Sequence, residues 1–579
     1  MDSESEAGTR GEFRQRVVVF LLLVGFGGLF LLNNWARDFW APGEVDFAAA
    51  CREMSARGNW FEPTIAGRPY FEKPILVYWL ALFFGSTGMD DHVAYRLPGA
   101  LFGVLGLWVT YYAGRMFVSR GVGILALVIQ GTSYLYFRTS SWFLTDVVFA
   151  SLVSLCILAF AIRILWSRYS TRWLVVGYLS LAFACLAKSP LLAPYFVGMV
   201  LLLFVFFQHG LRRIGTEFGK LKIPLGLLGV LLVLAPWYVW MISRYGWTFL
   251  DDHFFEHHLQ RLQEAQSHRQ RGWYYFFTLP ADFLPWSIFL PFVCFYVHSH
   301  FDRSAQKFFT IWALVVFISL SLVSSKYGKY LLPMWTPLAL LLSCGLHEVE
   351  RESIWEGFMN AAALRLLPWL LRLVAALLIV AGALWLSNAL PGSLQEAPFV
   401  GLLEDSSFKS KALTLGTLLA VVLAVLSFYV ARQVKQRKAL GAVYLSAVGF
   451  ALVFAVASFH YSDFNQVKSA RAFVRSAEQL VGNRPLAVYG KARPVICVYM
   501  KKEFADIFGV LGTTGKNKED ETRLLEYLES PKEQFLLMYD KDRKKLEGDF
   551  PRFAHLYKPV HSGYIGSRRL YWVMSNRVR

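Results

Sequence analysis

The chain has 579 residues, of which 55% are hydrophobic, 16% aromatic and only 17% charged, and its mean hydropathy is +0.40. Soluble globular domains carry about 25% charged residues, so this composition excludes an ordinary soluble protein and indicates that a lipid bilayer is the main solvent. The formal net charge of +18 could suggest a nucleic-acid partner. We expect none, because much of the Lys and Arg lies in short loops between apolar runs and no aromatic-basic module accompanies it.

Apolar runs long enough to cross a membrane recur from Val17 almost to Phe459; a spanning helix needs about 20 such residues. The first run lacks a small-residue cleavage site, so we expect residues 17–32 to be a retained signal anchor. The sequence therefore predicts a polytopic α-helical membrane protein with about thirteen transmembrane helices. Their expected positions are residues 17–33, 93–113, 121–138, 146–163, 173–187, 191–207, 223–241, 285–299, 308–323, 330–346, 368–388, 412–430 and 438–458.

Basic residues gather in alternate loops of this arrangement, which by the positive-inside rule face the cytoplasm together with the N-terminus. An odd number of spans then puts the C-terminal region on the opposite, extracytoplasmic side. Charged groups at membrane depth are costly and usually line a cavity or a functional centre. Nearly every unusual polar residue lies in the loops predicted for that side, which are residues 34–92, 139–146, 188–190, 242–284, 324–329 and 389–411.

Two regions are expected. Residues 1–458 form the membrane region, which includes the long first external loop at 34–92, and residues 459–579 form a small soluble α/β domain. In the first loop, residues 44–54 predict an amphipathic helix along the membrane interface that ends near Gly58. The strands and helices expected in the soluble domain lie near residues 485–489, 495–499, 534–539 and 570–574, and near 467–481 and 519–528 respectively.

Three acidic residues are candidates for chemistry. Glu44 and Asp46 lie just outside the first span, where either can act as a general base toward an acceptor hydroxyl, or simply begin a solvated helix. Asp146 lies at the external mouth of a span and is either a functional group or a local partner of Arg138. For Asp146 we favour function.

Lysines and tyrosines on the same side are candidates for binding a phosphate carried on a lipid. Lys73 lies among aromatic residues directly before an apolar run, and Lys188 lies in a tight turn between two spans. Lys326, Lys329 and Tyr330 lie between two further spans. Snorkelling of a lysine to the membrane surface is the alternative explanation, and it applies to at least one of Lys326 and Lys329.

A histidine-rich segment at residues 256–261 can bind either a metal or a phosphate. His258 and Arg261 are three residues apart and therefore share a helical face. The spacing matches no standard zinc motif, and the six cysteines show no metal-type spacing. Phosphate binding is the preferred interpretation. We expect no required cofactor; a divalent ion is not indicated, with Glu72 and His258 as the candidate ligands if one binds.

In this order, these motifs resemble the bacterial lipid A aminoarabinose transferases and the wider dolichyl-phosphate-mannose-protein mannosyltransferase-like family. The resemblance covers nearly the whole chain. Its pieces are Tyr-Phe-Glu-Lys-Pro at 70–74, Arg-Leu-Pro at 96–98, Leu-Thr-Asp at 144–146, Ala-Lys-Ser-Pro at 187–190, Glu-His-His-Leu-Gln-Arg at 256–261, Leu-Pro-Trp-Ser at 284–287, Lys-Tyr-Leu-Leu-Pro at 329–333 and Pro-Leu-Ala-Leu at 337–340.

The resemblance implies the GT-C fold and an inner-membrane enzyme that moves a sugar from a polyprenyl phosphate to an acceptor outside the cytoplasm, generally with inversion. It makes Lys73 a contact for the donor phosphate, and Asp146 a catalytic or substrate-orienting carboxylate. His258 and Arg261 become part of the same phosphate and headgroup site. It adds Lys326, Lys329 and Tyr330 as further donor-site candidates.

The first loop departs from the family pattern. Where the family has Pro-Asp-Glu followed by an Arg two positions on, this chain has Pro42-Gly43-Glu44 followed by Asp46. The expected base is therefore Glu44 or Asp46.

The predicted function is glycosyl transfer from a polyprenyl-phosphate sugar to lipid A or another envelope glycan, with membrane lipids as further partners. Three alternatives stay open. One is a protein O-mannosyltransferase-like activity, which differs in its acceptor. The others are a polyprenyl-lipid transporter, which should show polar residues at mid-bilayer and repeated helices, and a non-catalytic envelope assembly factor, for which Gly43 would signal lost chemistry.

Overall fold

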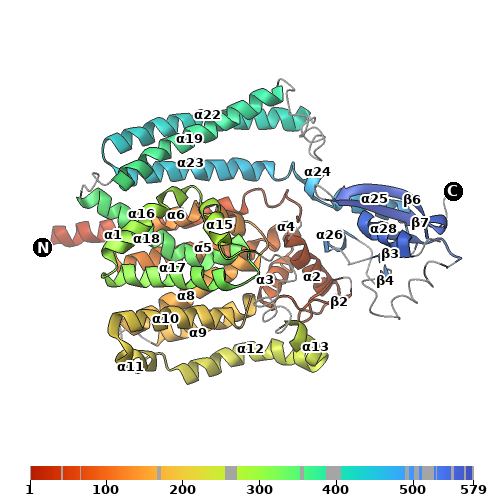
Figure 1. The fold of residues 1–579 in the computed structure, drawn as a ribbon, viewed down its shortest axis with the longest axis horizontal. Coiled ribbons are helices and arrows are strands. Elements are labelled where there is room, and N and C mark those ends of the chain that lie inside the picture. The colour runs from red at the N-terminus through yellow and green to blue at the C-terminus, as the bar shows by residue number, and fades with distance from the viewer. Residues whose placement is uncertain are drawn as a thin grey trace.

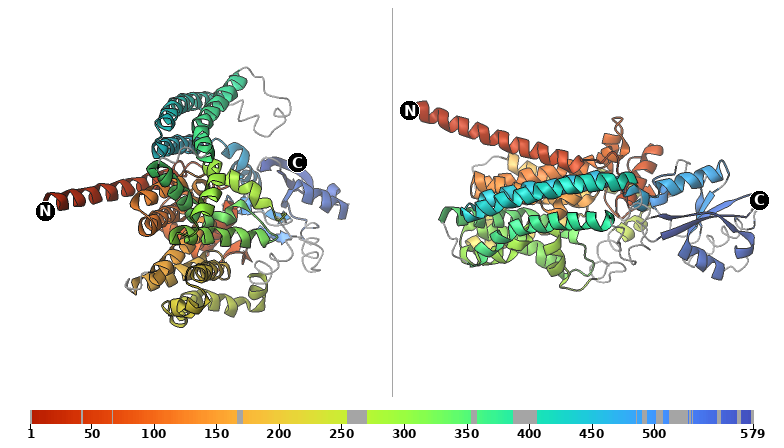
Figure 2. Two further views of the ribbon diagram at one scale, coloured as in Figure 1. Left: turned by 60° about the vertical axis from the view of Figure 1, so that its left-hand side comes forward. Right: turned by 90° about the horizontal axis from the view of Figure 1, so that it is seen from above.

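The computed structural model has a bundle of long helices and a small β-sheet region at one end of it (Figure 1). The N-terminus lies at the opposite end, and both views in Figure 2 keep the sheet region beyond the bundle. The structure describes residues 2–40, 43–65, 67–165, 171–253, 270–352, 358–386, 406–484, 486–489, 494–500, 507–511, 527, 529, 531–549, 553–565 and 569–576.

Ten helical segments in the described part of the chain are long and apolar enough to cross a membrane. Each coincides with one of the predicted spans, so the polytopic helical architecture is confirmed. The helices are α1 (Asp2–Leu31), α4 with α5 (Asp91–Ala94 and Leu97–Phe117), α8 (Thr145–Leu165), α10 (Leu192–His209), α12 (Ile223–Tyr245), α17 (Ser304–Leu322), η4 with α18 (Gly328–Met334 and Trp335–Glu352), α19 (Phe358–Leu386), α22 (Ser406–Lys435) and α23 (Ala439–His460).

Three predicted spans take other forms. Helix α6 (Arg120–Gly131) has 12 residues and rises only about 18 Å, well short of a bilayer core of about 30 Å; it is followed by α7 (Tyr134–Ser140). Helix α9 (Arg172–Ala187) is also short, with 16 residues. The span expected at 285–299 is a broken pair, in which α15 (Tyr274–Asp282) meets η3 (Trp286–Phe289) and α16 (Leu290–His300) at 119°.

Close helix packing in the bundle relies on small residues. Helix α5 packs against α6 and α8, and at Gly106 an added Cβ would lie 2.2 Å from the hydroxyl of Tyr136 and 2.6 Å from that of Ser151. Glycine at such contacts lets helix backbones approach closely where lipid provides no hydrophobic driving force. Helices α19, α22 and α23 form an outer layer along one side of the bundle (Figure 1).

The first loop contains α2 (Glu44–Ala56), the hairpin strands β1 (Thr64–Ile65) and β2 (Arg68–Pro69), and α3 (Leu76–Gly85). As predicted, α2 ends just before Gly58, whose φ of +63° suits glycine. The helix itself is confirmed, and its position along the membrane interface stays a prediction. Most of its residues are buried inside the protein, because α2 packs against α3, β1 and the C-terminal helix α26 (Pro494–Cys497).

The C-terminal region forms a five-stranded sheet in the order β4-β3-β5-β7-β6. Strand β3 is parallel to β4 and β5, whereas β7 is antiparallel to β5 and β6. The strand predicted at 495–499 is wrong, since Pro494 begins α26 there and proline suits the first turn of a helix. The elements are α24 (Asn465–Lys468), α25 (Arg471–Val481), β3 (Leu486–Tyr489), β4 (Ile507–Leu511), β5 (Phe535–Tyr539), α28 (Asp540–Asp549), α29 (Phe553–Leu556), β6 (Lys558–Ile565) and β7 (Arg569–Ser575).

The C-terminal region binds the first loop through polar contacts. The amide of Asn465 accepts hydrogen bonds from the backbone of Asp38 and the indole of Trp40, both at 3.0 Å, and donates to the carbonyl of Ala36 at 2.7 Å. Arg471 pairs with Asp38 at 3.0 Å. These contacts attach the sheet region to the segment between the first span and α2.

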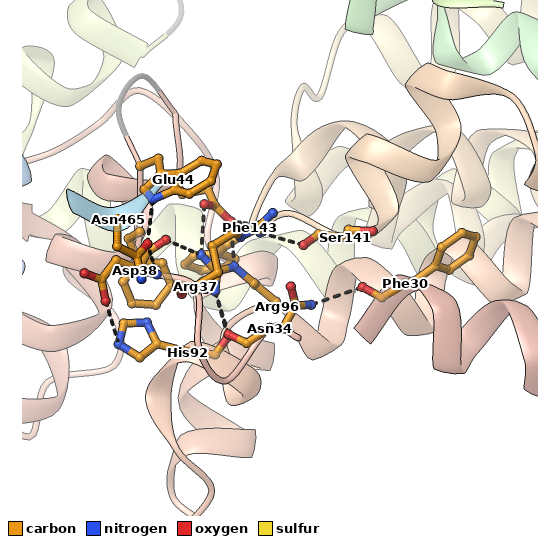
Figure 3. Close-up of polar contacts among 12 residues, drawn as sticks. Phe30, Asn34, Arg37, Asp38, Glu44, His92, Arg96, Ser141, Phe143 and Asn465 are labelled. Atoms are coloured by element: carbon orange, nitrogen blue, oxygen red, sulfur yellow. Dashed lines mark hydrogen bonds and ion pairs between the residues drawn. The ribbon is translucent and has the colours of Figure 1, made fainter. Parts of the chain in front are cut away.

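A buried charge network fixes the first loop against the helix bundle (Figure 3). Glu44 accepts from Arg96 at 2.8 and 3.0 Å, from Arg37 at 3.1 Å and from the backbone N–H of Phe143 at 2.9 Å. The side chains of Glu44 and both arginines are fully buried. Arg96 also donates to the backbone carbonyls of residues 34, 37 and 38.

Burial by itself would raise the pKa of Glu44, but the charges of Arg37 and Arg96 outweigh it and lower this pKa to about 2. The carboxylate is therefore ionised at neutral pH.

Replacing Glu44 with Gln is expected to destabilise the protein by about 3–5 kcal/mol, because two buried guanidinium groups lose their counter-charge. The wild-type contribution should be fully present above the ordinary carboxyl pKa of 4.5 and fade as the pH falls toward 2. Thermal unfolding of the purified protein at pH 7 measures the first effect. Asp46→Asn, two residues away and without an ion pair to any described residue, is the control; equal losses in both variants would contradict the role of the network.

Replacing Asn465 with Ala is expected to loosen the C-terminal region by about 1–3 kcal/mol, because partly buried donors lose their acceptor. Limited proteolysis of the full-length protein should then cut faster between residues 459 and 470. Asn59→Ala, whose side chain bonds only within the first loop, is the matched control. An unchanged cleavage rate in Asn465→Ala would show that these bonds do not hold the region in place.

Candidate active site

A cavity of about 540 Å³ lies at the end of the helix bundle that carries the first loop. This volume suits a small-molecule or headgroup site. Its walls come from the first loop, α7 and the start of α8, the end of α9, α15, and the segment that leads into η4. The lining residues are Gly43, Asp46, Phe47, Tyr70, Glu72, Lys73, Leu135, Arg138, Thr139, Trp142, Leu144, Thr145, Asp146, Lys188, Tyr274, Thr278, Asp282, Ser325, Tyr327, Gly328, Lys329 and Tyr330.

Asp146 binds two lysines across the cavity. Its Oδ1 lies 2.6 Å from Nζ of Lys188 and its Oδ2 lies 3.3 Å from Nζ of Lys329. The ammonium of Lys188 also lies 4.4 Å from the ring centre of Tyr330, within cation–π range. Three segments far apart in the sequence thus meet at one carboxylate, and four of the predicted site residues lie together.

A second charged group in the wall comes from the first loop. Lys73 lies 3.1 Å from the carboxylate of Glu72, whose other oxygen accepts from the hydroxyl of Tyr70 at 2.6 Å. Both Lys73 and Glu72 are partly exposed to the cavity. Lys73 is therefore held at the cavity wall by its sequence neighbour.

Asp46 projects from the first turn of α2 into the same cavity and is half-buried. No hydrogen bond or ion pair from a described residue reaches its carboxylate. Burial and the nearby charge of Glu72 raise the pKa of Asp46 to about 6. The positive charges of Lys329 and Lys73 lower this pKa, but by less. A carboxylate with a pKa close to neutral and no fixed partner has the properties of a general base.

Glu44 lies outside the cavity lining, in the buried network of Figure 3. Its pKa of about 2 leaves it little tendency to take up a proton. Gly43, at the position of the family's Asp, has a φ of +118°, a conformation that side-chain-bearing residues rarely adopt. A Cβ there would lie 3.3 Å from Leu144. The backbone of this chain is therefore shaped for glycine at 43, and of the two candidate bases, Glu44 and Asp46, Asp46 is the one that lines the cavity.

Of the remaining predicted residues, Lys326 lies outside the cavity lining. The ammonium of Lys326 donates to the carbonyls of Val323 and, at 3.3 Å, Gln270, and Lys326 is not among the lining residues. His258 and Arg261 fall outside the described residues. Glu72, named above as a candidate metal ligand, is paired as described; within the part of the chain that the structure covers, no three His, Cys, Asp or Glu side chains gather as a metal site.

Two charged residues of the cavity went unassigned by sequence reasoning. Arg138, treated there only as a neighbour of Asp146, stacks on Trp142 at 4.8 Å. Asp282, at the end of α15, has a buried Oδ2 that accepts no hydrogen bond from a described residue, and this oxygen lies against Gly328. The break between α15 and η3 brings Asp282 to the cavity. The motif at 284–287 marks that break, but no local pattern indicates that Asp282, two residues before it, faces a site.

Comparison with known proteins gives a consistent result. Residues 72–240 match the family model described as dolichyl-phosphate-mannose-protein mannosyltransferase. The chain is 28% identical over 372 residues to the undecaprenyl phosphate-alpha-4-amino-4-deoxy-L-arabinose arabinosyl transferase of Edwardsiella ictaluri, an alignment that covers 60% of this chain and 65% of that protein. For the protein of the same name from Pseudomonas aeruginosa the identity is 28%, over 66% of this chain and 68% of that protein. The match to several of these relatives spans only about three fifths of their length.

Solved structures show the same fold over almost the full chain. ArnT from Cupriavidus metallidurans, solved with bound undecaprenyl phosphate, superimposes with a TM-score of 0.73 at 17% identity, over 96% of this chain and 98% of that one. The Archaeoglobus fulgidus oligosaccharyltransferase tethered to an acceptor peptide gives a TM-score of 0.51 at 12% identity, over 97% of this chain and 74% of that one. The resemblance inferred from the motifs is confirmed: this chain has the GT-C glycosyltransferase fold and is similar in sequence to the aminoarabinose transferases.

Proposed function

We propose that this protein is a membrane glycosyltransferase that moves a sugar from a polyprenyl-phosphate donor to lipid A or another envelope glycan. The observation that carries this proposal is the half-buried carboxylate of Asp46, which no described residue pairs with, in a cavity that also holds three lysines. The names of its relatives support the donor class, since they are called undecaprenyl phosphate-aminoarabinose transferases. A fold shared with a protein crystallised with undecaprenyl phosphate adds further support.

The donor phosphate would bind among Lys73, Lys188 and Lys329. In the structure Lys73 is paired with Glu72, and Lys188 and Lys329 share the carboxylate of Asp146. A phosphate that enters therefore exchanges one set of charged contacts for another. Negative charge grows on the departing phosphate in the transition state, and preorganised cations stabilise it most at that point. Asp146 then has a positioning role, because it holds Lys188 and Lys329 at one place in the cavity. The polyprenyl tail would extend into a groove between spans.

Asp46 would act as the general base that activates the acceptor hydroxyl or phosphate for attack at the anomeric carbon. A base works best when its pKa lies near the working pH, and burial brings Asp46 to about 6. Arg138 and Asp282 supply one further group of each charge in the same cavity, suited to polar groups of the sugar or acceptor. His258 and Arg261 would add to the phosphate site, as the resemblance implies.

The proposed orientation has the N-terminus in the cytoplasm of an inner-membrane protein and the cavity on the extracytoplasmic side. Residues 1–458 would form the catalytic membrane domain and residues 459–579 a soluble domain on the same side as the cavity. The basic loops support this assignment. So does the attachment of the C-terminal region to the first loop, which contributes to the cavity wall.

A second candidate activity is protein O-mannosyltransferase-like transfer, favoured by the name of the family model that matches residues 72–240. Mass spectrometry of lipid A, envelope glycans and envelope proteins from cells with and without the chain separates the two. Sugar on protein alone would favour the second candidate. No change in any of the three would favour a transporter or a non-catalytic assembly factor.

Asp46→Asn is expected to lower the transfer rate by about 10²–10⁴, the usual contribution of a positioned base. In the wild type, the rate should fall as the pH drops below about 6, because Asp46 becomes protonated, and this dependence should be absent from the residual activity of the variant. Transfer from undecaprenyl-phosphate aminoarabinose to lipid A in proteoliposomes measures both. Asp302→Asn, in an exposed loop after α16, is the control. Normal transfer by Asp46→Asn would rule out Asp46 as the base.

Lys73→Ala is expected to slow the same transfer by about 10²–10³, the cost of losing one preorganised charge at the leaving group. Lys326→Ala is the matched comparison, because its ammonium faces backbone carbonyls outside the cavity. Thermal unfolding of both variants checks that each is folded. If Lys326→Ala lost as much activity as Lys73→Ala while folded, the assignment of the donor site to this cavity would fail.

A further inference from the structure

A second cavity, of about 440 Å³, lies between the first loop and the C-terminal region. Helix α2 separates it from the active-site cavity, since Asp46 and Phe47 line the active-site cavity and Ala48 and Arg52 line the second one. The lining residues are Trp35, Phe39, Ala48, Arg52, Asp90, Asp91, His92, Tyr95, Arg471, Arg475, Val498 and Tyr499. The catalytic proposal uses none of them.

Three arginines from two elements face this second cavity. Arg471 and Arg475 are four residues apart and so share one face of α25, whose other face is buried. Arg52 comes from α2 and donates to the carbonyl of Val498 at 2.7 Å. Arg475 is exposed, and no ion pair or hydrogen bond from a described residue reaches its guanidinium. The cavity therefore presents a guanidinium group with unused donors.

The carboxylates around the second cavity already have partners. Asp90 accepts the backbone N–H of His92 at 2.8 Å and so caps α4. Asp91 interacts with Arg52 and with the hydroxyl of Tyr95. Asp38, behind the lining, pairs with Arg471 at 3.0 Å. Arg475 is thus left to bind an anion from outside the chain, with Arg52 and Arg471 beside it.

The second cavity lies at the level where spans end. Trp35 follows the end of α1 at Leu31 by four residues, and Asp91 begins the next candidate span. The Trp35 side chain is 59% exposed, and tryptophan is enriched where a membrane meets water. About half of the lining is aromatic or aliphatic. This combination suits a headgroup whose acyl chains remain in the bilayer better than it suits a small ion from solution.

We propose that this second cavity binds the phosphate of an anionic membrane lipid, with Arg475, Arg471 and Arg52 as its ligands. Guanidinium groups match phosphate oxygens in geometry and charge, and basic residues near a membrane surface attract anionic lipid headgroups. The bound lipid would join α2 to α25 and so add to the attachment of the C-terminal region. This proposal is independent of the transfer activity.

The test uses the full-length protein in detergent and phosphatidylglycerol as the probe, with binding followed by native mass spectrometry. We expect one site that Arg475→Gln weakens about fivefold, the effect of one basic residue at a membrane surface. Arg475→Glu should weaken it more, whereas Arg475→Lys should largely restore it. Arg484→Gln is the control, because Arg484 lies in the same region but pairs with Glu533.

Two further binding measurements, with phosphatidylcholine and with inorganic phosphate, identify the source of the phosphate. Phosphatidylcholine should bind this site several-fold more weakly than phosphatidylglycerol, because it carries no net negative charge. Inorganic phosphate should compete only at far higher concentration than the lipid. Equal binding of phosphatidylglycerol by the wild type and Arg475→Glu would overturn the site. Inorganic phosphate that bound as tightly as the lipid would overturn the assignment to a membrane lipid.

Discussion

Glu44 binds two arginines in the interior of the protein, and the position of the first loop depends on that contact. Because Arg96 begins α5 and Arg37 precedes α2, the carboxylate joins the loop to the helix bundle. Arg96 uses its remaining donors on the backbone of residues 34–38, the segment to which the C-terminal region attaches through Asp38 and Asn465. Removing Glu44 would leave two buried guanidinium groups without their counter-charge, so the whole network depends on this one carboxylate.

This network also explains the difference between two acids only two residues apart. Successive residues of an α-helix are rotated by about 100°, so Glu44 and Asp46 point to roughly opposite sides of the first turn of α2. Glu44 therefore meets the arginines, and its pKa falls to about 2, whereas Asp46 meets the cavity, and its pKa rises to about 6. The same helix directs Arg52 to the second cavity. One short helix thus supplies a structural acid, a candidate base and a candidate lipid contact.

The charges of the active-site cavity are largely balanced among themselves. Four acids and four bases line it, namely Asp46, Glu72, Asp146 and Asp282 with Lys73, Arg138, Lys188 and Lys329. The two lysines on Asp146 and the one on Glu72 are held in place without a substrate. Such an arrangement keeps the site close to neutral and pre-positions its cations, which would lower the reorganisation needed to bind the phosphate of the proposed donor.

The sequence by itself determined that this is a polytopic helical membrane protein. It also determined where most of the helices lie and at which end of the bundle the polar residues gather. Each follows from local composition: apolar runs of sufficient length, basic loops at alternate ends, and lysines or acids at span mouths. The motif order also predicted the GT-C fold, and the C-terminal strands at 486–489, 535–539 and 569–575 lie where short apolar runs indicated them.

Only the tertiary structure decided which of these residues share a cavity. The ion pairs of Asp146 join residues 42 and 183 positions apart in the chain, and no local pattern carries that information. The positions of three other side chains also depend on tertiary contacts. Glu44 meets two buried arginines, and Lys326 meets two backbone carbonyls. A helix break brings Asp282 to the cavity. Sequence patterns report how each segment meets water or lipid, whereas the direction of a single side chain depends on which distant segment packs against it.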